Sequence, residues 1–503
     1  MKNTHNLIEK LAAAPAEWKH KIMLSLIICV GLIIRLSIIN REVGFDEALS
    51  IYIARQPLGG LLNFALRSWE MSPPFYHLLI KVLLCISSSA VWLRMFSLAC
   101  GLLVIFMTYK VGKLLFDKST GLLSCALVAF STSFIYYSVE IRAYSFYVLC
   151  SVLSIYFFLR LIGTFSKKYI VLYVVFLTLA IYSHYYGIFL LFGTFLFLAL
   201  HKKLFPGDFK LWCIVLASIC ILLIPEAVYG FIKARRFMLL GEYYINRKLS
   251  INDISDLFSC YSGNWIVFLV YILAVVIGIR SKLKNSLSNL GLAQDRRLIL
   301  GNYKARFLLI QLLLPITIVF IVSLTRYSIF QEFRFFIPFF IFYYVIIARC
   351  CLFYRGRFRK WLAILLVLLM FASAVRDCII LRKKPHGRYE KIAKLLKPKL
   401  HPSDVLAVTN IYDSLQIFNY LNRTIKFIVD SEEMKKFYIL KAMDFNDDEA
   451  IKDIAQLISV NRLWLILEKG SVLPVWFKNN NQIKLSENIE IEKTKIQLYS
   501  IYH

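Results

Sequence analysis

The stretch IMLSLIICVGLIIRLSIINREVGFDE, residues 22–47, decides the fold. Its first part, 22–39, is almost entirely apolar and long enough to cross a membrane as a helix. It is too long for the apolar region of a signal peptide and has no small-residue cleavage site, so we expect an uncleaved first span. Further runs of this kind predict about eleven membrane helices, near 22–40, 90–109, 119–138, 143–162, 169–187, 188–200, 211–229, 264–280, 307–325, 335–350 and 361–377.

The composition agrees with a polytopic α-helical membrane protein. The 503 residues are 59% hydrophobic, and 60 Lys and Arg stand against 31 Asp and Glu. Soluble globular domains average about 45–50% apolar residues, so a soluble globular protein is excluded. A net charge of +29 would raise nucleic acid as a partner. Most of this charge falls in short loops between spans, which indicates membrane topology instead.

Charge and cysteine content divide the chain at residue 380. Residues 1–380 hold 40 Lys and Arg against 16 Asp and Glu, whereas 381–503 hold 20 against 15 and none of the 11 cysteines. We predict a transmembrane domain over 1–380, with a first outer loop at 41–88, and a soluble α/β domain over 381–503. In this tail helical patterns at 387–396 and 410–421 and strand patterns at 405–408 and 462–467 alternate, which favours a small parallel sheet.

The loop charges predict the orientation. Lys and Arg favour the cytoplasmic side of a membrane, and 25 of the 40 basic residues lie in the amino end, 110–118, 160–168, 202–210, 280–306 and 349–360. The amino terminus is therefore predicted to be cytoplasmic and the soluble tail extracytoplasmic. This orientation requires that the short apolar stretch 75–87, which follows two prolines and contains Lys81, lies at the membrane interface and does not cross the membrane.

Two carboxylates, Asp46 and Glu47, follow the first span on the predicted outer side. A carboxylate at the boundary of an apolar slab is partly desolvated, so we expect a raised pKa and a better general base. The alternative is that one of the two caps the next helix, where acids favour the amino end.

A second outer group lies at the junction between the third and fourth spans. It comprises Glu140, Arg142 and Tyr144, and the first and last of these share a helix face. An ionisable group at such a junction is expensive and usually lines a polar cavity. The alternative is a local ion pair at a helix start.

Histidine and arginine complete the predicted outer face. His184 and Tyr185 lie in the polar break YSHYYG, where they could bind phosphate or sugar or belong to an aromatic belt. Arg334 follows Arg326 and Glu332, and a guanidinium either grips phosphate or snorkels to the interface. No two histidines stand at ligand spacing, so no metal site is assigned and a divalent metal ion stays an open cofactor.

Seven short motifs occur in order along the chain: FDE at 45–47, SPPFY at 72–76, LRMFS at 93–97, KLLFD at 113–117, YYSVEIRAY at 136–144, SHYYG at 183–187 and FRFFIP at 333–338. With them the sequence resembles the bacterial members of glycosyltransferase family 39, the protein-mannosyltransferase-like branch of the membrane GT-C fold, related to the aminoarabinose transferase of lipid A. The resemblance covers nearly the whole chain. Relatives acting on lipid A often carry Lys directly before Pro-Pro, where this sequence has Ser72.

This resemblance implies a hexosyl- or pentosyltransferase of the bacterial inner membrane. It would move a sugar from a polyprenyl-phosphate donor, with inversion, to a lipid, polysaccharide or protein acceptor on the extracytoplasmic side. Asp46 matches the family's first-loop catalytic acid, with Glu47 beside it, and Glu140 matches a second acidic position that shapes the active site. Candidates for the donor phosphate or sugar are Arg142, Tyr144, His184, Tyr185 and Arg334.

Two other classes stay open from the residues alone. A flippase or transporter for a lipid-linked glycan would also need arginines and acids, but transporters place ionisable residues and broken helices near the bilayer midplane. Here these residues gather at one predicted face. A glycan polymerase or ligase would use a similar donor, carrying an oligosaccharide on a diphosphate.

Overall fold

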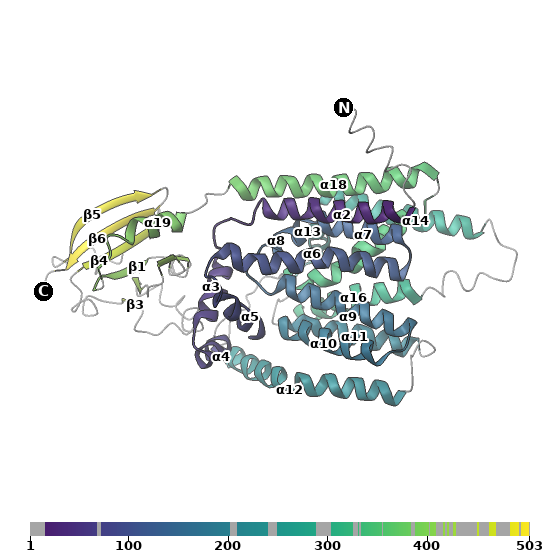
Figure 1. Ribbon diagram of the computed structural model, residues 1–503, viewed down its shortest axis with the longest axis horizontal. Coiled ribbons are helices and arrows are strands. Elements are labelled where there is room, and N and C mark those ends of the chain that lie inside the picture. The colour runs from purple at the N-terminus through teal and green to yellow at the C-terminus, as the bar shows by residue number, and fades with distance from the viewer. Residues whose placement is uncertain are drawn as a thin grey trace, which may run out of the picture. The chain divides into compact units, whose positions relative to one another are not determined.

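Figure 1 shows the computed structural model of the chain. It describes residues 16–67, 72–201, 209–239, 249–287, 303–324, 330, 333–354, 356–383, 388–401, 403–408, 416–417, 420–421, 426–428, 450–451, 462–468, 483–491 and 494–501. The chain forms two compact units, one from residues 1–39 and 94–381 and the other from 40–93 and 382–503. The domain boundary predicted at residue 380 stays a prediction.

The first unit is built from helices, many of which run along a common direction (Figure 1). Within it α2 packs on α7, α7 on α17, and α9 on α10. Its elements are α2 (Ala16–Leu36), α6 (Ala90–Leu115), α7 (Lys118–Phe130), α8 (Thr132–Tyr137), α9 (Tyr144–Gly163), α10 (Lys167–Ser183), η1 (Tyr185–Gly187), α11 (Ile188–Leu200), α12 (Phe209–Leu239), α13 (Asn252–Ser262), α14 (Trp265–Leu287), α16 (Tyr303–Ser323), η3 (Phe333–Phe339), α17 (Phe340–Cys351) and α18 (Gly356–Lys383).

Each of the eleven predicted spans contains helix, but their lengths differ. Over the described ranges, six helices are long and apolar enough to cross a membrane, and a seventh is counted if α13 and α14, bent by 94°, form one broken span. Three other predicted spans are shorter helices, namely α7 and α11 with 13 residues each and α10 with 17. The first predicted span is the 21-residue helix α2, which is not among the six because Lys19, Lys21 and Arg35 add charge to it. Hydropathy marks apolar segments, whereas helix length also depends on where caps and turns interrupt them.

Glycines bring α6 and α7 into close contact. A Cβ on Gly112 would lie 2.8 Å from the Cα of Gly121, and a Cβ on Gly121 would lie 2.6 Å from the carbonyl oxygen of Tyr109. Small residues at a helix crossing let backbones approach in a membrane, where packing drives helix association. At the start of α7, Asp117 pairs with Arg349 of α17 at 2.7 Å.

In the second unit the first loop forms three helices, α3 (Phe45–Arg55), α4 (Leu58–Arg67) and α5 (Phe75–Leu84). The ammonium group of Lys81 on α5 donates to the carbonyl oxygens of Ala54, at 3.2 Å, and Gln56, at 2.6 Å. These carbonyls lie at the end of α3, where a helix leaves acceptors without intrahelical donors. Lys81 therefore ties α5 to α3, which accounts for a charge in an otherwise apolar helix.

The carboxyl-terminal part contains a six-stranded sheet in the order β3-β2-β1-β4-β6-β5. The helix predicted at 387–396 and both predicted strands are present, as α19 (Arg388–Leu396), β1 (Val405–Val408) and β4 (Arg462–Glu468). The helix predicted at 410–421 lies mostly outside the described residues. The strands β2 (Lys426–Ile428) and β3 (Ala450–Ile451) extend the parallel half.

The sheet is mixed rather than purely parallel. The strands β5 (Ile483–Ile491) and β6 (Thr494–Ile501) pair antiparallel with each other, and β6 pairs antiparallel with β4. Only two residues separate β5 from β6, and a parallel pair needs a crossover of a dozen residues or more. The short connection therefore dictates the antiparallel edge.

A hydrogen bond joins the first loop to the tail within this unit. The carboxylate of Glu42 accepts the backbone N–H of Tyr389 at 2.8 Å, across a separation of 347 residues. Tyr389 lies in the first turn of α19, where backbone N–H groups lack intrahelical partners and negative charge is favoured. Glu42 thus caps a helix of the carboxyl-terminal domain.

Candidate active site

Glu47 fixes the start of α3. Its Oε2 accepts the backbone N–H of Gly44 at 2.9 Å in a capping box, and its Oε1 pairs with Arg41 at 3.5 Å. The Glu47 side chain is almost completely buried. Both carboxylate oxygens therefore serve the local structure, so the capping alternative raised from the sequence applies to Glu47.

Asp46 lies in the same first turn of α3 and is half-buried. Its backbone carbonyl accepts the hydroxyl of Ser50 at 3.0 Å, which continues the helix. The Glu47 capping box sets the direction in which the chain enters α3. The capping contact at this helix start is made by Glu47, and Asp46 lies one residue before it in the same turn.

The loop that carries Glu140 is pinned at both ends. It connects α8 to α9, and the hydroxyl of Ser97 on α6 donates to the carbonyl oxygen of Glu140 at 2.7 Å. The hydroxyl of Ser145 donates back to the carbonyl of Tyr137 at 2.9 Å. Glu140 is 5% exposed. The backbone at Glu140 is therefore held by a neighbouring helix, and the side chain is buried.

Arg35, inside the first predicted span, braces the same loop. Its Nε donates to the hydroxyl of Ser138 at 2.8 Å, and its Nη1 donates to the carbonyl oxygens of Gly31 and Ala129 at 3.0 and 2.9 Å. The side chain is 1% exposed. The sequence reasoning did not single out Arg35, although an ionisable residue within a membrane helix is a signal of a specific role.

Two guanidinium groups meet at one tyrosine ring. The Cζ atoms of Arg142 and Arg334 each lie 5.9 Å from the ring centroid of Tyr144, and the charges of both Arg334 and Glu140 act on Tyr137. Tyr144 and Arg142 are buried. Guanidinium groups bind phosphate oxygens, so this cluster could hold an anion alongside the carboxylate of Glu140.

His184 lies against the same group. Its ring stacks on Tyr147 with centroids 5.1 Å apart, and it lies 6.4 Å from Tyr144 and 4.5 Å from Phe335. Its Nδ1 accepts the backbone N–H of Tyr186 at 3.2 Å. A neutral imidazole that accepts at Nδ1 carries its proton on Nε2, which makes Nε2–H the donor of this side chain.

Tyr185 lies beside a different charge, which the sequence reasoning missed. Its hydroxyl lies next to the carboxylate of Glu226 on α12, a residue that also interacts with Lys233. Glu226 and Lys233 are 5% and 3% exposed. A Cβ on Gly230 would lie 3.6 Å from the Tyr185 ring, so α12 passes close to this turn. A buried acid within a predicted span is the signal that could have revealed this pair.

The predicted site residues thus form two groups. Asp46 and Glu47 belong to one compact unit, whereas Glu140, Arg142, Tyr144, His184, Tyr185 and Arg334 belong to the other. Arg326 and Glu332 lie outside the described residues. Within the described part of the chain, no three His, Cys, Asp or Glu side chains converge in a way that could hold a metal ion.

Comparison with known proteins identifies the fold. Residues 71–229 match the family model described as dolichyl-phosphate-mannose-protein mannosyltransferase. ArnT from Cupriavidus metallidurans, in the apo state, aligns with a TM-score of 0.63 and 12% identity over 94% of this chain and 97% of that one. ArnT bound to undecaprenyl phosphate aligns with a TM-score of 0.64 and 12% identity over 96% and 98%. The chain has the GT-C glycosyltransferase fold.

A more distant GT-C structure also aligns. The oligosaccharyltransferase AglB from Archaeoglobus fulgidus, in complex with an inhibitory peptide and a dolichol-phosphate, gives a TM-score of 0.52 and 12% identity over 90% of this chain and 69% of that one. No curated protein sequence matches the chain. The predicted GT-C fold is confirmed, and the chain is a multi-pass membrane protein. The orientation of its termini stays a prediction.

Proposed function

We propose that this GT-C chain is an inverting glycosyltransferase. It moves a hexose or pentose from a polyprenyl-phosphate donor to a hydroxyl-bearing lipid, polysaccharide or protein on the extracytoplasmic face of the bacterial inner membrane. The bound undecaprenyl phosphate of ArnT and the dolichol-phosphate of AglB support a lipid-phosphate donor.

The observation that carries this proposal is the pair of arginines at Tyr144. A sugar–phosphate bond breaks with the electron pair going to the phosphate oxygen, so negative charge grows on the leaving group. Arg142 and Arg334 would stabilise that charge, because preorganised cations in a buried site cost no reorganisation during the reaction. The Nε2–H of His184, which packs against Tyr144, adds a neutral donor for phosphate or sugar oxygens.

Asp46 is the proposed general base. The acceptor hydroxyl oxygen attacks the anomeric carbon from the side opposite the phosphate, which inverts the configuration, and its proton passes to the Asp46 carboxylate. The carbon–oxygen bond to the polyprenyl phosphate breaks at the same time, and the phosphate leaves as an anion. Glu47 acts as a positioning residue through its capping box, and Glu140 shapes the site from a pinned loop.

Transfer from a synthetic polyprenyl-phosphate sugar in proteoliposomes tests the proposal. Mass spectrometry of the envelope glycolipids of cells with and without the protein identifies the natural sugar and acceptor. Asp46→Asn is expected to lower kcat at least 100-fold, since general bases contribute about 10²–10⁴-fold. The matched control is Glu47→Gln at the neighbouring position. It is expected to lower thermal stability, because the capping box and the ion pair with Arg41 weaken.

Three outcomes would contradict the proposed function. Full activity of Asp46→Asn would remove the assigned base. Use of a diphosphate-linked oligosaccharide in preference to the monophosphate sugar would instead identify a polymerase or ligase. Movement of the intact donor across the bilayer without transfer would identify a flippase.

A further inference from the structure

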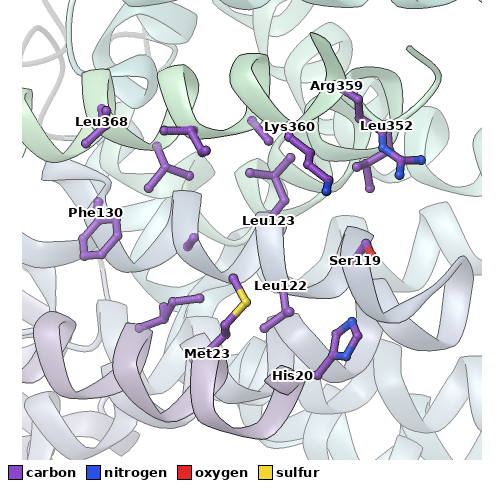
Figure 2. A pocket seen from close by; sticks show the side chains of 15 residues that line it. His20, Met23, Ser119, Leu122, Leu123, Phe130, Leu352, Arg359, Lys360 and Leu368 are labelled. Carbon is purple, nitrogen blue, oxygen red and sulfur yellow. The ribbon is translucent and has the colours of Figure 1, made fainter. Parts of the chain in front are cut away.

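A cavity of about 600 Å³ lies among α2, α7 and α18 in the membrane unit (Figure 2). It is distinct from the cluster at Tyr144, since none of its lining residues belongs to the candidate active site. Cavities of roughly 300–1,000 Å³ hold small ligands, so this volume is large enough for one acyl chain of a lipid and part of the lipid head group.

The two ends of the cavity differ in chemistry. His20, Arg359 and Lys360 gather at one end together with the hydroxyl-bearing Ser119 (Figure 2). Arg359 and Lys360 are exposed, so their charges are available at the mouth. The rest of the wall is apolar. The cavity is therefore a slot with cationic groups at one end and a continuous apolar surface along the rest.

The apolar end is formed partly by α18. Ile364 and Leu368 line the cavity yet are 48% and 57% exposed, and Phe130 of α7 closes the same end (Figure 2). Large apolar side chains that line a cavity and remain this exposed indicate that the slot opens sideways. In a membrane protein that opening faces the acyl chains of the bilayer.

We infer that this slot is a binding site for one anionic phospholipid of the surrounding bilayer. Its phosphate would lie among Arg359, Lys360, His20 and Ser119, and one acyl chain would occupy the apolar slot between α2 and α18. Basic pockets between transmembrane helices on the cytoplasmic side bind anionic head groups. The basic end is formed by two segments that the loop charges predict to be cytoplasmic, the amino end and 349–360. The inference does not depend on glycosyl transfer.

Native mass spectrometry of the full-length protein in detergent tests the site, with phosphatidylglycerol as the probe and phosphatidylcholine as the neutral comparison. Arg359→Gln/Lys360→Gln is expected to weaken phosphatidylglycerol retention roughly 30-fold, because each basic side chain near a membrane surface contributes about fivefold. The matched control is Lys167→Gln/Lys168→Gln, which removes two exposed charges from another predicted cytoplasmic loop without touching the cavity. It is expected to retain the lipid.

A second variant tests the apolar slot. Ala363→Phe fills the cavity and is expected to abolish retention, whereas Ala372→Phe makes the same change at an exposed position of α18 outside the cavity and is expected to retain the lipid. Equal retention of phosphatidylcholine, or equal losses in both control variants, would overturn the site. Retention of polyprenyl phosphate, lost in the cavity variants while phosphatidylglycerol binding is unchanged, would assign the slot to the glycosyl carrier and overturn the proposed occupant.

Discussion

Replacing Arg334 with glutamine separates phosphate stabilisation from packing. The substitution removes a guanidinium 5.9 Å from the Tyr144 ring but keeps a polar, uncharged side chain, shorter than that of arginine. Removing one preorganised donor from a developing oxyanion costs about 2.7–4 kcal/mol, or 10²–10³ in kcat. Arg334 is only half-buried, so we expect the lower end of this range, roughly a 100-fold loss of kcat.

The double variant with Arg142→Gln is the sharper measurement. If both guanidinium groups hold one phosphate, their effects are coupled, and the combined loss should be about 10³ rather than the 10⁴ expected of independent sites. Initial rates of transfer from a polyprenyl-phosphate sugar, followed by mass spectrometry, give these numbers. Multiplicative losses would show that the two arginines act on different groups, and an unchanged kcat in either single variant would refute the phosphate assignment.

Arg160 provides the control for lost packing. It donates to the hydroxyl of Tyr169 at 2.8 Å, and its Cζ lies 5.2 Å from that ring, so it makes the same kind of arginine–tyrosine contact elsewhere in the unit. Arg160→Gln should lose a similar cation–π stabilisation, about 0.5–2 kcal/mol, with unchanged kcat. A fall in kcat equal to that of Arg334→Gln would attribute both effects to stability.

Three further predictions concern groups that support the site. Arg35→Met should lower the free energy of unfolding by about 1–3 kcal/mol and reduce transfer, because its three buried acceptors lose a donor; unchanged melting and rates would contradict this. Gly121→Leu should abolish monodisperse protein in size-exclusion chromatography, whereas Gly163→Leu, with no atom within 4 Å of its added Cβ, should not. Glu226→Gln should reduce transfer by up to about tenfold and add nothing to Tyr185→Phe, since both remove one interaction; additive losses would refute the link.

Apolar segments could be predicted well because hydropathy is a local property. All eleven predicted spans contain helix, and the described part of the tail contains the helix predicted at 387–396 and both predicted strands. The antiparallel edge was not predicted, because the direction in which strands pair depends on the connection between them, here the short link between β5 and β6. Helix lengths were overestimated where a turn divides one apolar run, as between α7 and α8.

Roles within the candidate site were harder to predict. The sequence places Asp46 and Glu47 side by side, and only the capping geometry shows that Glu47 serves the helix start. Arg35 reaches Ser138 across 103 residues, a pairing that no periodicity encodes. Tyr185 and His184 are neighbours in sequence, yet Tyr185 contacts Glu226 while His184 packs on Tyr144. These differences arise from tertiary packing.

The hydrogen bond from the backbone of Tyr389 to Glu42 has a consequence for the order of synthesis. The loop bearing Asp46 leaves the ribosome early, but the helix that Glu42 caps follows 347 residues later. At about 5–20 residues per second, roughly 20–70 s pass before that partner exists. During this interval the nascent loop waits in an incomplete state, so a chain terminated before α19 would carry the proposed base without the contact that anchors its loop to the tail.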